Sequence, residues 1–292
     1  MRCLLVLWDI DFTLIDAGGV GTRLYRMVFR EMFGTELPGA ADMAGRTDRA
    51  IVLDTLARAG IPEPRQHLDQ FLARLAALAP TGRELAAQYS RALPGAAAAL
   101  DALAAFAPAP DGTALDGTAP DGNVSDCTSH ATSTAQAAST AHAPHHGTSG
   151  DGRSGDGASP LARRVCVVQS VLTGNVRPMA EMKLSALGLD GHLDLEAGAY
   201  GESHEVRAEL VHLARDKAAR RYGTDFSGAA TVLVGDTPLD VAAALETGAR
   251  VVAVATGGAT AAALAESGAH TVLPDLTDTP AVLSAILAHP YP

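Results

Sequence analysis

The chain has 292 residues, a formal net charge of −11 and a hydrophobic fraction of 47%. This length fits one large domain or two modest ones, with enough apolar residues for a core. The acidic balance argues against nucleic acid or an anionic membrane as the main partner. No apolar stretch reaches the roughly 18 residues of a membrane span, and no signal peptide is recognisable, so we expect a soluble cytoplasmic protein of undetermined oligomeric state.

The three cysteines, Cys3, Cys127 and Cys166, are scattered and lack the spacing of a metal site. Cys3 and Cys166 lie within apolar runs with strand character. Small buried thiols are common in such runs, so we interpret these two cysteines as buried thiols.

The first strong signal is an apolar run over residues 4–8 that ends in Asp9 and Asp11, followed by Thr13. Such a run is typical of a buried strand in a parallel sheet, whose carboxyl edge is where open α/β sheets bind ligands. Side chains alternate along a strand, so the two acids start on one face. Close carboxylates repel unless a cation or a shared proton relieves them, and Mg²⁺ prefers oxygen ligands. Alternatively, Asp9 merely ends the strand and Asp11 caps a turn.

Residues 18–90 have the pattern of a small helical unit inserted after this strand. Apolar residues recur at helical spacing over about 24–33, 50–59, 67–79 and 84–93. The segments Gly60-Ile61-Pro62 and Pro80-Thr81-Gly82 are predicted to separate these helices.

Within this unit, Gly45-Arg46-Thr47-Asp48 interrupts the helical pattern. One interpretation is that Arg46 faces a cleft and grips a phosphate or carboxylate bidentately. The other is that Thr47 or Asp48 caps the helix that follows.

A low-complexity segment occupies residues 107–160, after a predicted helix that contains Leu100, Leu103 and Phe106. It consists mainly of Gly, Ser, Thr, Ala, Asp, Pro and His and cannot bury enough apolar surface to offset chain ordering, so we predict disorder. Four histidines lie in it, but a flexible segment lacks the surrounding groups that orient His ligands, so we expect no metal site there.

A second buried strand is predicted over residues 164–172, ending in Thr173-Gly174-Asn175. A hydroxyl and exposed backbone N–H groups at a strand end can bind phosphate oxygens. The alternative is an ordinary turn in which Thr173 or Asn175 caps the next helix, predicted over 178–187. Residues 193–196 are predicted as a short strand, and a helix follows over 205–221.

The third signal is the strand 231–234 followed by Gly235, Asp236 and Asp240. Gly235 lets the backbone come close, and the two acids project towards the same strand edge as Asp9. Alternatively, Asp236 only caps the helix that begins near Val241. Strands over 250–255 and 271–273 and a helix over 280–288 complete the alternating pattern.

These motifs resemble those of the haloacid dehalogenase (HAD) superfamily, and most closely its phosphoglycolate-phosphatase-like members. Asp9, Asp11 and Thr13 stand at the positions of the first motif, Asp-x-Asp-x-Thr. Thr173-Gly174-Asn175 resembles the second motif, and Asp236 with Asp240 the fourth. The resemblance covers nearly the whole chain apart from the low-complexity segment. Dehalogenases proper lack the second Asp, so Asp11 indicates phosphoryl transfer.

The resemblance implies roles for these residues. Asp9 would be the nucleophile and Asp11 the general acid/base, while Thr13, Thr173, Gly174, Asn175 and Arg46 would bind the substrate. Mg²⁺ would be held by Asp9, Asp11, Asp236 and, through water, Asp240. The third motif supplies a basic residue, which we assign to Arg207 with Lys183 as the fallback. Alternatively, Arg207 is a solvated residue in a first helical turn.

The alternation of strands and helices, together with the resemblance, predicts an α/β protein with a doubly wound parallel sheet. Its HAD Rossmann-like core would comprise residues 1–17 and 91–292, and a helical cap residues 18–90. The implied function is a Mg²⁺-dependent phosphatase that hydrolyses a small phosphorylated metabolite, a phosphomonoester, through an aspartyl-phosphate. Alternatives are a phosphosugar mutase, a pyrophosphatase, or a non-catalytic HAD-fold binding protein.

Overall fold

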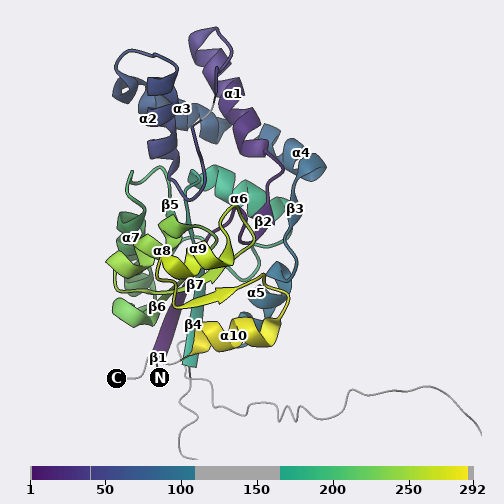
Figure 1. Ribbon diagram of the computed structural model, residues 1–292, viewed down its shortest axis with the longest axis vertical. Coiled ribbons are helices and arrows are strands. Elements are labelled where there is room, and N and C mark those ends of the chain that lie inside the picture. Colours follow the sequence, from purple (N-terminus) through teal and green to yellow (C-terminus); the bar gives the residue numbers. More distant parts are fainter. Residues whose placement is uncertain (1, 40, 109–164, 289–292) are drawn as a thin grey trace, which may run out of the picture. The chain divides into compact units, whose positions relative to one another are not determined.

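A computed structural model of the chain describes residues 2–39, 41–108 and 165–288 (Figure 1). Nearly all of the predicted low-complexity segment 107–160, including Cys127, lies outside the described residues. None of the helices in the described ranges has the length and hydropathy to span a bilayer.

The core is a parallel sheet of six strands with β1 (Arg2–Trp8) near its centre. Its order is β5-β4-β1-β6-β7-β8, and every neighbouring pair is parallel. The other strands are β4 (Val165–Thr173), β5 (Ala199–Tyr200), β6 (Thr231–Gly235), β7 (Arg250–Val254) and β8 (Thr271–Leu273). The predicted α/β class and parallel sheet are confirmed, because both neighbours of β1 run in its own direction.

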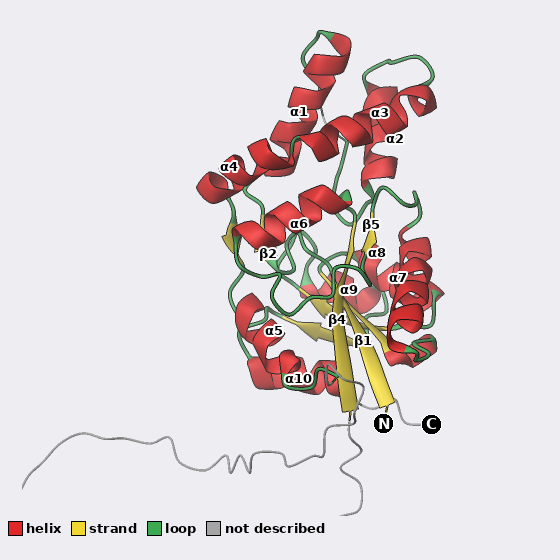
Figure 2. Ribbon diagram, turned by 180° about the vertical axis from the view of Figure 1, so that it is seen from behind, coloured by secondary structure: helices red, strands yellow, loops and turns green. Residues whose placement is uncertain are grey.

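Helices cover both faces of this sheet, as alternation along β1 requires (Figure 2). Val6 and Trp8 belong to a buried cluster with α5, α6 and α10, whereas Leu5 and Leu7 belong to a second cluster with α7, α8 and α9. These helices are α5 (Ala96–Ala104), α6 (Arg177–Ala186), α7 (Arg207–Tyr222), α8 (Pro238–Glu246), α9 (Ala261–Glu266) and α10 (Thr279–Leu287), with a 3₁₀ turn at Gly228–Ala230. The sheet is therefore doubly wound.

The helical unit comprises α1 (Val20–Phe33), α2 (Asp48–Arg58), α3 (Pro64–Ala77) and α4 (Ala79–Tyr89). These helices share a third buried cluster, to which Met179 and Met182 of α6 also belong. The chain enters and leaves the unit through β2 (Ile15–Asp16) and β3 (Arg91–Ala92), which pair antiparallel. The unit therefore packs on α6 through this cluster, and its action as a cap domain stays a prediction.

Two local expectations were wrong. Residues 193–196 form turns rather than a strand, and the edge strand β5 lies at Ala199–Tyr200 instead. Pro80 and Gly82 lie inside the first turn of α4 rather than between helices. A proline in the first turn costs no helical hydrogen bond, because its N–H would have no partner there. Gly82 fits because a Cβ would approach Met182 Cε to 2.7 Å.

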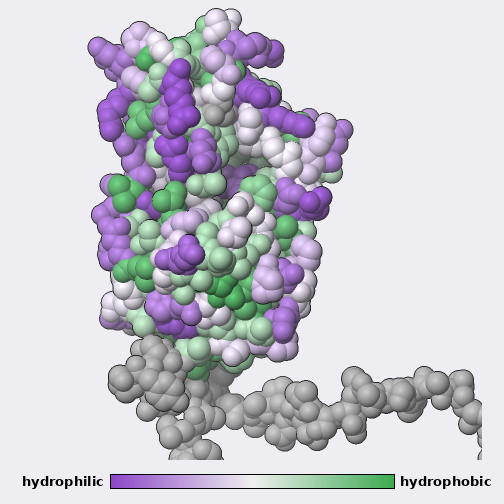
Figure 3. Space-filling model, viewed as in Figure 1, coloured by the Kyte–Doolittle hydropathy of each residue, from purple (hydrophilic) through white to green (hydrophobic). Residues whose placement is uncertain are grey.

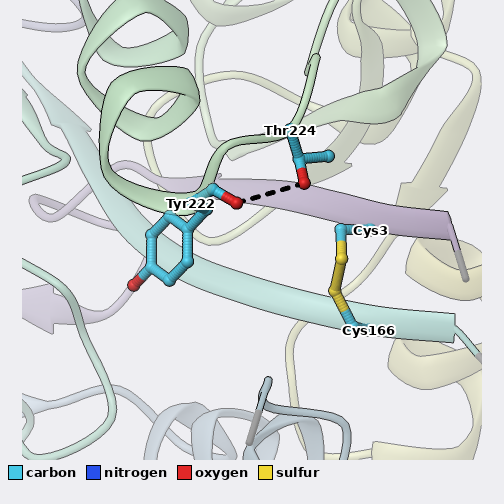
Figure 4. The surroundings of a disulfide bond; sticks show 4 residues. All are labelled: Cys3, Cys166, Tyr222 and Thr224. Carbon is cyan, nitrogen blue, oxygen red and sulfur yellow. Dashed lines mark hydrogen bonds between the residues drawn. A yellow bond between two sulfur atoms is a disulfide. The ribbon is translucent and has the colours of Figure 1, made fainter. Parts of the chain in front are cut away.

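The interpretation of Cys3 and Cys166 as separate thiols was also wrong. They lie opposite each other on neighbouring strands β1 and β4, with a Cα–Cα distance of 4.4 Å, and form a disulfide (Figure 4). The two residues are 163 positions apart in sequence. Their pairing depends on the register of β1 against β4, which composition and spacing do not reveal.

We expect the unreduced, denatured protein to contain one titratable thiol per chain, rising to three after reduction, because the chain has three cysteines. The double variant Cys3→Ala/Cys166→Ala should lose about 2–5 kcal/mol of unfolding free energy, since the bridge constrains a long loop of the unfolded chain. Thiol titration and urea denaturation measure these effects. Three thiols before reduction would contradict the disulfide.

Candidate active site

Three buried carboxylates converge at the carboxyl edge of the sheet. Asp9 follows β1, Asp236 follows the neighbouring β6, and Asp240 lies in the first turn of α8. One oxygen from each of them lies within 4.8 Å of the others. Because β1 and β6 are adjacent and parallel, their carboxyl ends deliver these acids to one place.

The loop after Asp9 is tightly bonded to its surroundings. The Asp9 N–H donates to the Val234 carbonyl (2.8 Å), and Phe12 has a positive φ of 59°. This turn brings Thr13 into the interior, where its hydroxyl donates to Asp236 Oδ1 (3.3 Å). Thr13 therefore links the loop after β1 to the end of β6. Its predicted contact with substrate stays a prediction.

Arg207 bridges two of the acids. It is the first residue of α7, and its Nη2 lies 2.9 Å from Asp9 Oδ1 and 2.6 Å from Asp240 Oδ1. The side chain is buried, so the alternative of a solvated helix residue is wrong. Burial alone would lower the pKa of Arg207, but the charges of Asp240 and Asp9 outweigh it and raise that pKa. Arg207 is therefore a fixed positive charge at this site.

Asp240 combines this ion pair with a helix cap. Its Oδ2 accepts hydrogen bonds from the Thr237 N–H (3.1 Å) and hydroxyl (2.6 Å), while the Asp240 N–H donates to Thr237 Oγ1. This reciprocal capping box begins α8, so the alternative that Asp236 caps this helix is wrong. Gly235 makes room for the arrangement, because a Cβ there would lie 2.3 Å from Asp240 Cγ.

The acids outnumber the positive charge beside them. Burial raises the pKa of Asp9 to about 7 and that of Asp236 to about 8, and repulsion from neighbouring acids adds to both shifts. Asp9 Oδ1 is paired with Arg207, and Asp236 Oδ1 accepts a hydrogen bond from Thr13. A cluster of buried oxygens with unrelieved negative charge fits a divalent cation such as Mg²⁺.

Asp11 lies in a second polar group with Thr173, Asn175 and Lys183. Lys183 Nζ donates to both Asp11 oxygens (2.8 and 2.7 Å) and to Asn175 Oδ1 (2.8 Å). Asn175 Nδ2 donates to Asp11 Oδ2 (2.8 Å) and Thr173 Oγ1 (2.7 Å). The Asp11 carboxylate is thus paired with Lys183 and is not part of the acid cluster found among the described residues. Its assignment as a metal ligand stays a prediction.

Both candidates for the third-motif basic residue therefore contact a first-motif acid. Arg207 pairs with Asp9 and Lys183 with Asp11. Lys183 is buried although it lies in the middle of α6. It lies on the buried face of this helix, and the sequence offered no stronger signal for it than the rarity of lysine in this chain.

Gly174 and Arg46 lie where α2 begins beside β4. The Gly174 carbonyl accepts from the Asp48 N–H (2.7 Å), and a Cβ on Gly174 would lie 1.9 Å from the Arg46 carbonyl. The Arg46 guanidinium bonds Asp54 Oδ2 (2.8 Å) and the Ala50 carbonyl (3.2 Å), and Thr47 caps α2. Gly174 therefore permits close packing, while substrate binding by Arg46 stays a prediction.

Asp48 is a buried site residue that sequence reasoning treated only as a possible cap. Its Oδ1 accepts from the Tyr25 hydroxyl (2.5 Å) and its Oδ2 from the Val176 N–H (2.7 Å). Burial raises the pKa of Asp48 to about 6. Asp48 thus ties the helical unit to the start of α6.

A cavity of about 560 Å³ connects these groups. It is bounded at one end by Asp9, Asp11 and Asp236 and continues along α1 and α2. Its volume is typical of a small-molecule site.

Solved structures share this fold across their full length. A predicted phosphatase from Clostridium acetobutylicum has a TM-score of 0.58 at 12% identity, covering 97% of this chain and 100% of that one. A hydrolase from Pseudomonas syringae has a TM-score of 0.54 at 17% identity, covering 97% and 98%. A candidate β-phosphoglucomutase from Bacteroides vulgatus has a TM-score of 0.52 at 12% identity, covering 99% and 91%. At these identities the likeness concerns the fold.

A family model described as HAD-hydrolase-like matches residues 209–279, a segment that includes Asp236 and Asp240. This segment of the chain therefore resembles HAD-like hydrolases. No curated protein sequence matches the chain.

Without a divalent cation, the protein should become less stable as the pH rises from about 4 to about 8. The pKa values of Asp9 (about 7) and Asp236 (about 8) exceed those of unfolded carboxyl groups (about 4), so over this range the folded state keeps protons that the unfolded state has already lost. Mg²⁺ should raise the unfolding temperature more at the higher pH, because carboxylates bind it deprotonated. Thermal unfolding at both pH values measures this. Equal Mg²⁺ effects at both would contradict it.

Arg207→Met should lower the unfolding free energy of the metal-free protein by about 3–5 kcal/mol, since it leaves Asp9 and Asp240 buried without the guanidinium that pairs with them. Arg220→Met, at an exposed position on the same helix, is the matched control. Urea denaturation of both variants measures the difference. A loss below about 1 kcal/mol, the size typical of a surface ion pair, would show that Arg207 does not neutralise this cluster.

Proposed function

We propose that this protein is a HAD-type, Mg²⁺-dependent phosphatase that hydrolyses a small phosphomonoester through an aspartyl-phosphate on Asp9. The observation that carries the proposal is the position of Asp9, which is buried at a strand end, paired with Arg207 and grouped with Asp236 and Asp240. The match of residues 209–279 to a HAD-hydrolase-like family model and the structural likeness to a predicted phosphatase support it.

We assign the remaining oxygens of Asp9 and Asp236 to the cation, with Asp240 orienting the site through Arg207 and Thr237. When bound, Mg²⁺ neutralises charge on the transferring phosphoryl group. Arg207 contributes a second fixed positive charge beside the nucleophile.

In the first step, a carboxylate oxygen of Asp9 attacks phosphorus and the bond to the leaving alcohol breaks. Asp11 donates a proton to that alcohol oxygen, then takes a proton from the water that attacks the acyl phosphate. Lys183 donates to both oxygens of Asp11 and so fixes the position of this carboxylate.

Thr173, Gly174 and Asn175 are proposed to bind phosphate oxygens from the end of β4. Asn175 already orients both Thr173 Oγ1 and Asp11 Oδ2, which keeps the phosphate-binding and proton-transfer groups in a fixed relation. The helical unit, residues 18–90, is proposed as a cap that limits access of water and selects the substrate.

A phosphomutase is the second candidate, because one structural relative is a candidate β-phosphoglucomutase. Asp9 would again take up and pass on the phosphoryl group, and Asp11 would again transfer the protons. The phosphoryl acceptor would be a second hydroxyl of the sugar rather than water. Transfer of label between positions of one sugar phosphate would identify this activity.

The test is hydrolysis of p-nitrophenyl phosphate with and without Mg²⁺. Asp9→Asn should lower kcat by at least about a thousandfold, because it removes the nucleophile, and Asp11→Asn by about 10²–10⁴. Asp216→Asn, at an exposed position of α7, is the matched control and should retain activity. Acid-quenched wild-type protein should carry one phosphoryl group by mass spectrometry.

Metal-independent turnover, or an Asp9→Asn variant that remains active, would contradict the proposal. A folded protein that turns over no ester in a broad panel, and releases no phosphate from pyrophosphate, would favour a non-catalytic binding protein.

A further inference from the structure

The cavity beyond the acids has mainly apolar walls. As it leaves Asp9 and Asp11 it is lined by apolar and aromatic side chains of the helical unit and α6. These are Leu24, Tyr25, Met43, Ile51, Leu75 and Met179. Leu24, Tyr25, Ile51, Leu75 and Met179 also belong to the third buried cluster, so this wall of the cavity is backed by packed apolar side chains. On the face drawn in Figure 3, hydrophilic side chains are frequent over the helical unit and are mixed with apolar ones.

The charged side chains along this part of the cavity have protein partners, including Asp42, whose Oδ1 accepts from the Ala44 N–H (3.1 Å). The Thr22 hydroxyl also lines the cavity and contacts Met43 Sδ (3.9 Å). Arg46 is bonded to Asp54, and Asp48 accepts from the Tyr25 hydroxyl and the Val176 N–H. Lys183 donates to both Asp11 oxygens and to Asn175 Oδ1, which uses its three donors. Among the described lining residues, the basic groups Arg46, Lys183 and Arg207 are thus all engaged with protein acceptors.

This pattern bears on which leaving group the cavity accepts. A site that binds a sugar or a carboxylate needs free polar groups to replace the water that the substrate loses on binding. A substrate hydroxyl buried without a hydrogen-bond partner costs binding free energy. An alkyl or aryl group needs only apolar walls, against which it gains free energy for each methylene removed from water.

We propose that the substrate is a phosphomonoester of an apolar alcohol, alkyl or aryl, rather than of a sugar or a hydroxy acid. The phosphate lies against the acids and the leaving group occupies the apolar part of the cavity. This inference rests on the proposed phosphatase function for its reaction, but the apolar subsite makes a separate prediction about binding.

The experiment titrates methyl-, butyl- and hexylphosphonate, which are not hydrolysed, into the Mg²⁺-loaded protein by calorimetry. We expect affinity to rise about fourfold per methylene until the chain fills the subsite. Phosphonoacetate and glucose 6-phosphate should bind no more tightly than methylphosphonate. The same chain-length trend should appear in KM for the corresponding alkyl phosphates.

The variant Met43→Gln introduces a polar amide on the cavity wall with little change in volume. It should weaken hexylphosphonate about tenfold and leave methylphosphonate unchanged. Met27→Gln makes the same substitution at an exposed position of α1 and should change neither. Because Met43 is only partly buried, the variant should fold, and thermal unfolding checks this.

Affinity that does not vary with chain length, or tighter binding of phosphonoacetate or glucose 6-phosphate, would overturn the apolar subsite even if p-nitrophenyl phosphate is hydrolysed. A rising chain-length series without turnover of any ester would instead uphold the subsite and overturn the phosphatase function. The two proposals therefore fail separately.

Discussion

Neutralisation of buried carboxylates by Arg207 is the interaction on which the site depends. Three buried acids close together are strongly unfavourable unless positive charge compensates them. Arg207 supplies part of that compensation by bonding Asp9 and Asp240 at once. Its delocalised, permanently charged guanidinium suits a fixed bridge between two acids better than a lysine would. The charge that remains is what makes the cluster suitable for a divalent cation.

The parallel sheet places these groups, and the helical unit gives them an enclosure. Polar residues after β1, β4 and β6 meet because these strands are neighbours that run in one direction. Asp48 and Gly174 then join the start of α2 to the end of β4 through close backbone contacts. The side of the cavity that carries the acids is therefore built by the sheet, while its apolar side comes mainly from α1–α3.

Much of this arrangement could be predicted from the sequence, because strand ends carry strong local signals. The apolar runs before Asp9, Thr173 and Asp236 identify three strands, and the resemblance to a known superfamily supplies their adjacency. The side-chain partners could not be predicted. Nothing local distinguishes Arg207 from an exposed residue in a first helical turn, and Lys183 turns inward only because α6 packs on the core. Likewise, the short strand β5 depends on pairing with β4 rather than on its own composition.

The bond between Cys3 and Cys166 has a topological consequence. It closes a covalent ring that begins in β1, contains every helix from α1 to α5, and returns at β4. A single break in the backbone anywhere inside that ring would yield two polypeptides that remain joined by the disulfide. Separation of the N-terminal piece, with Asp9 and Asp11 on it, would require a reductant as well as a protease.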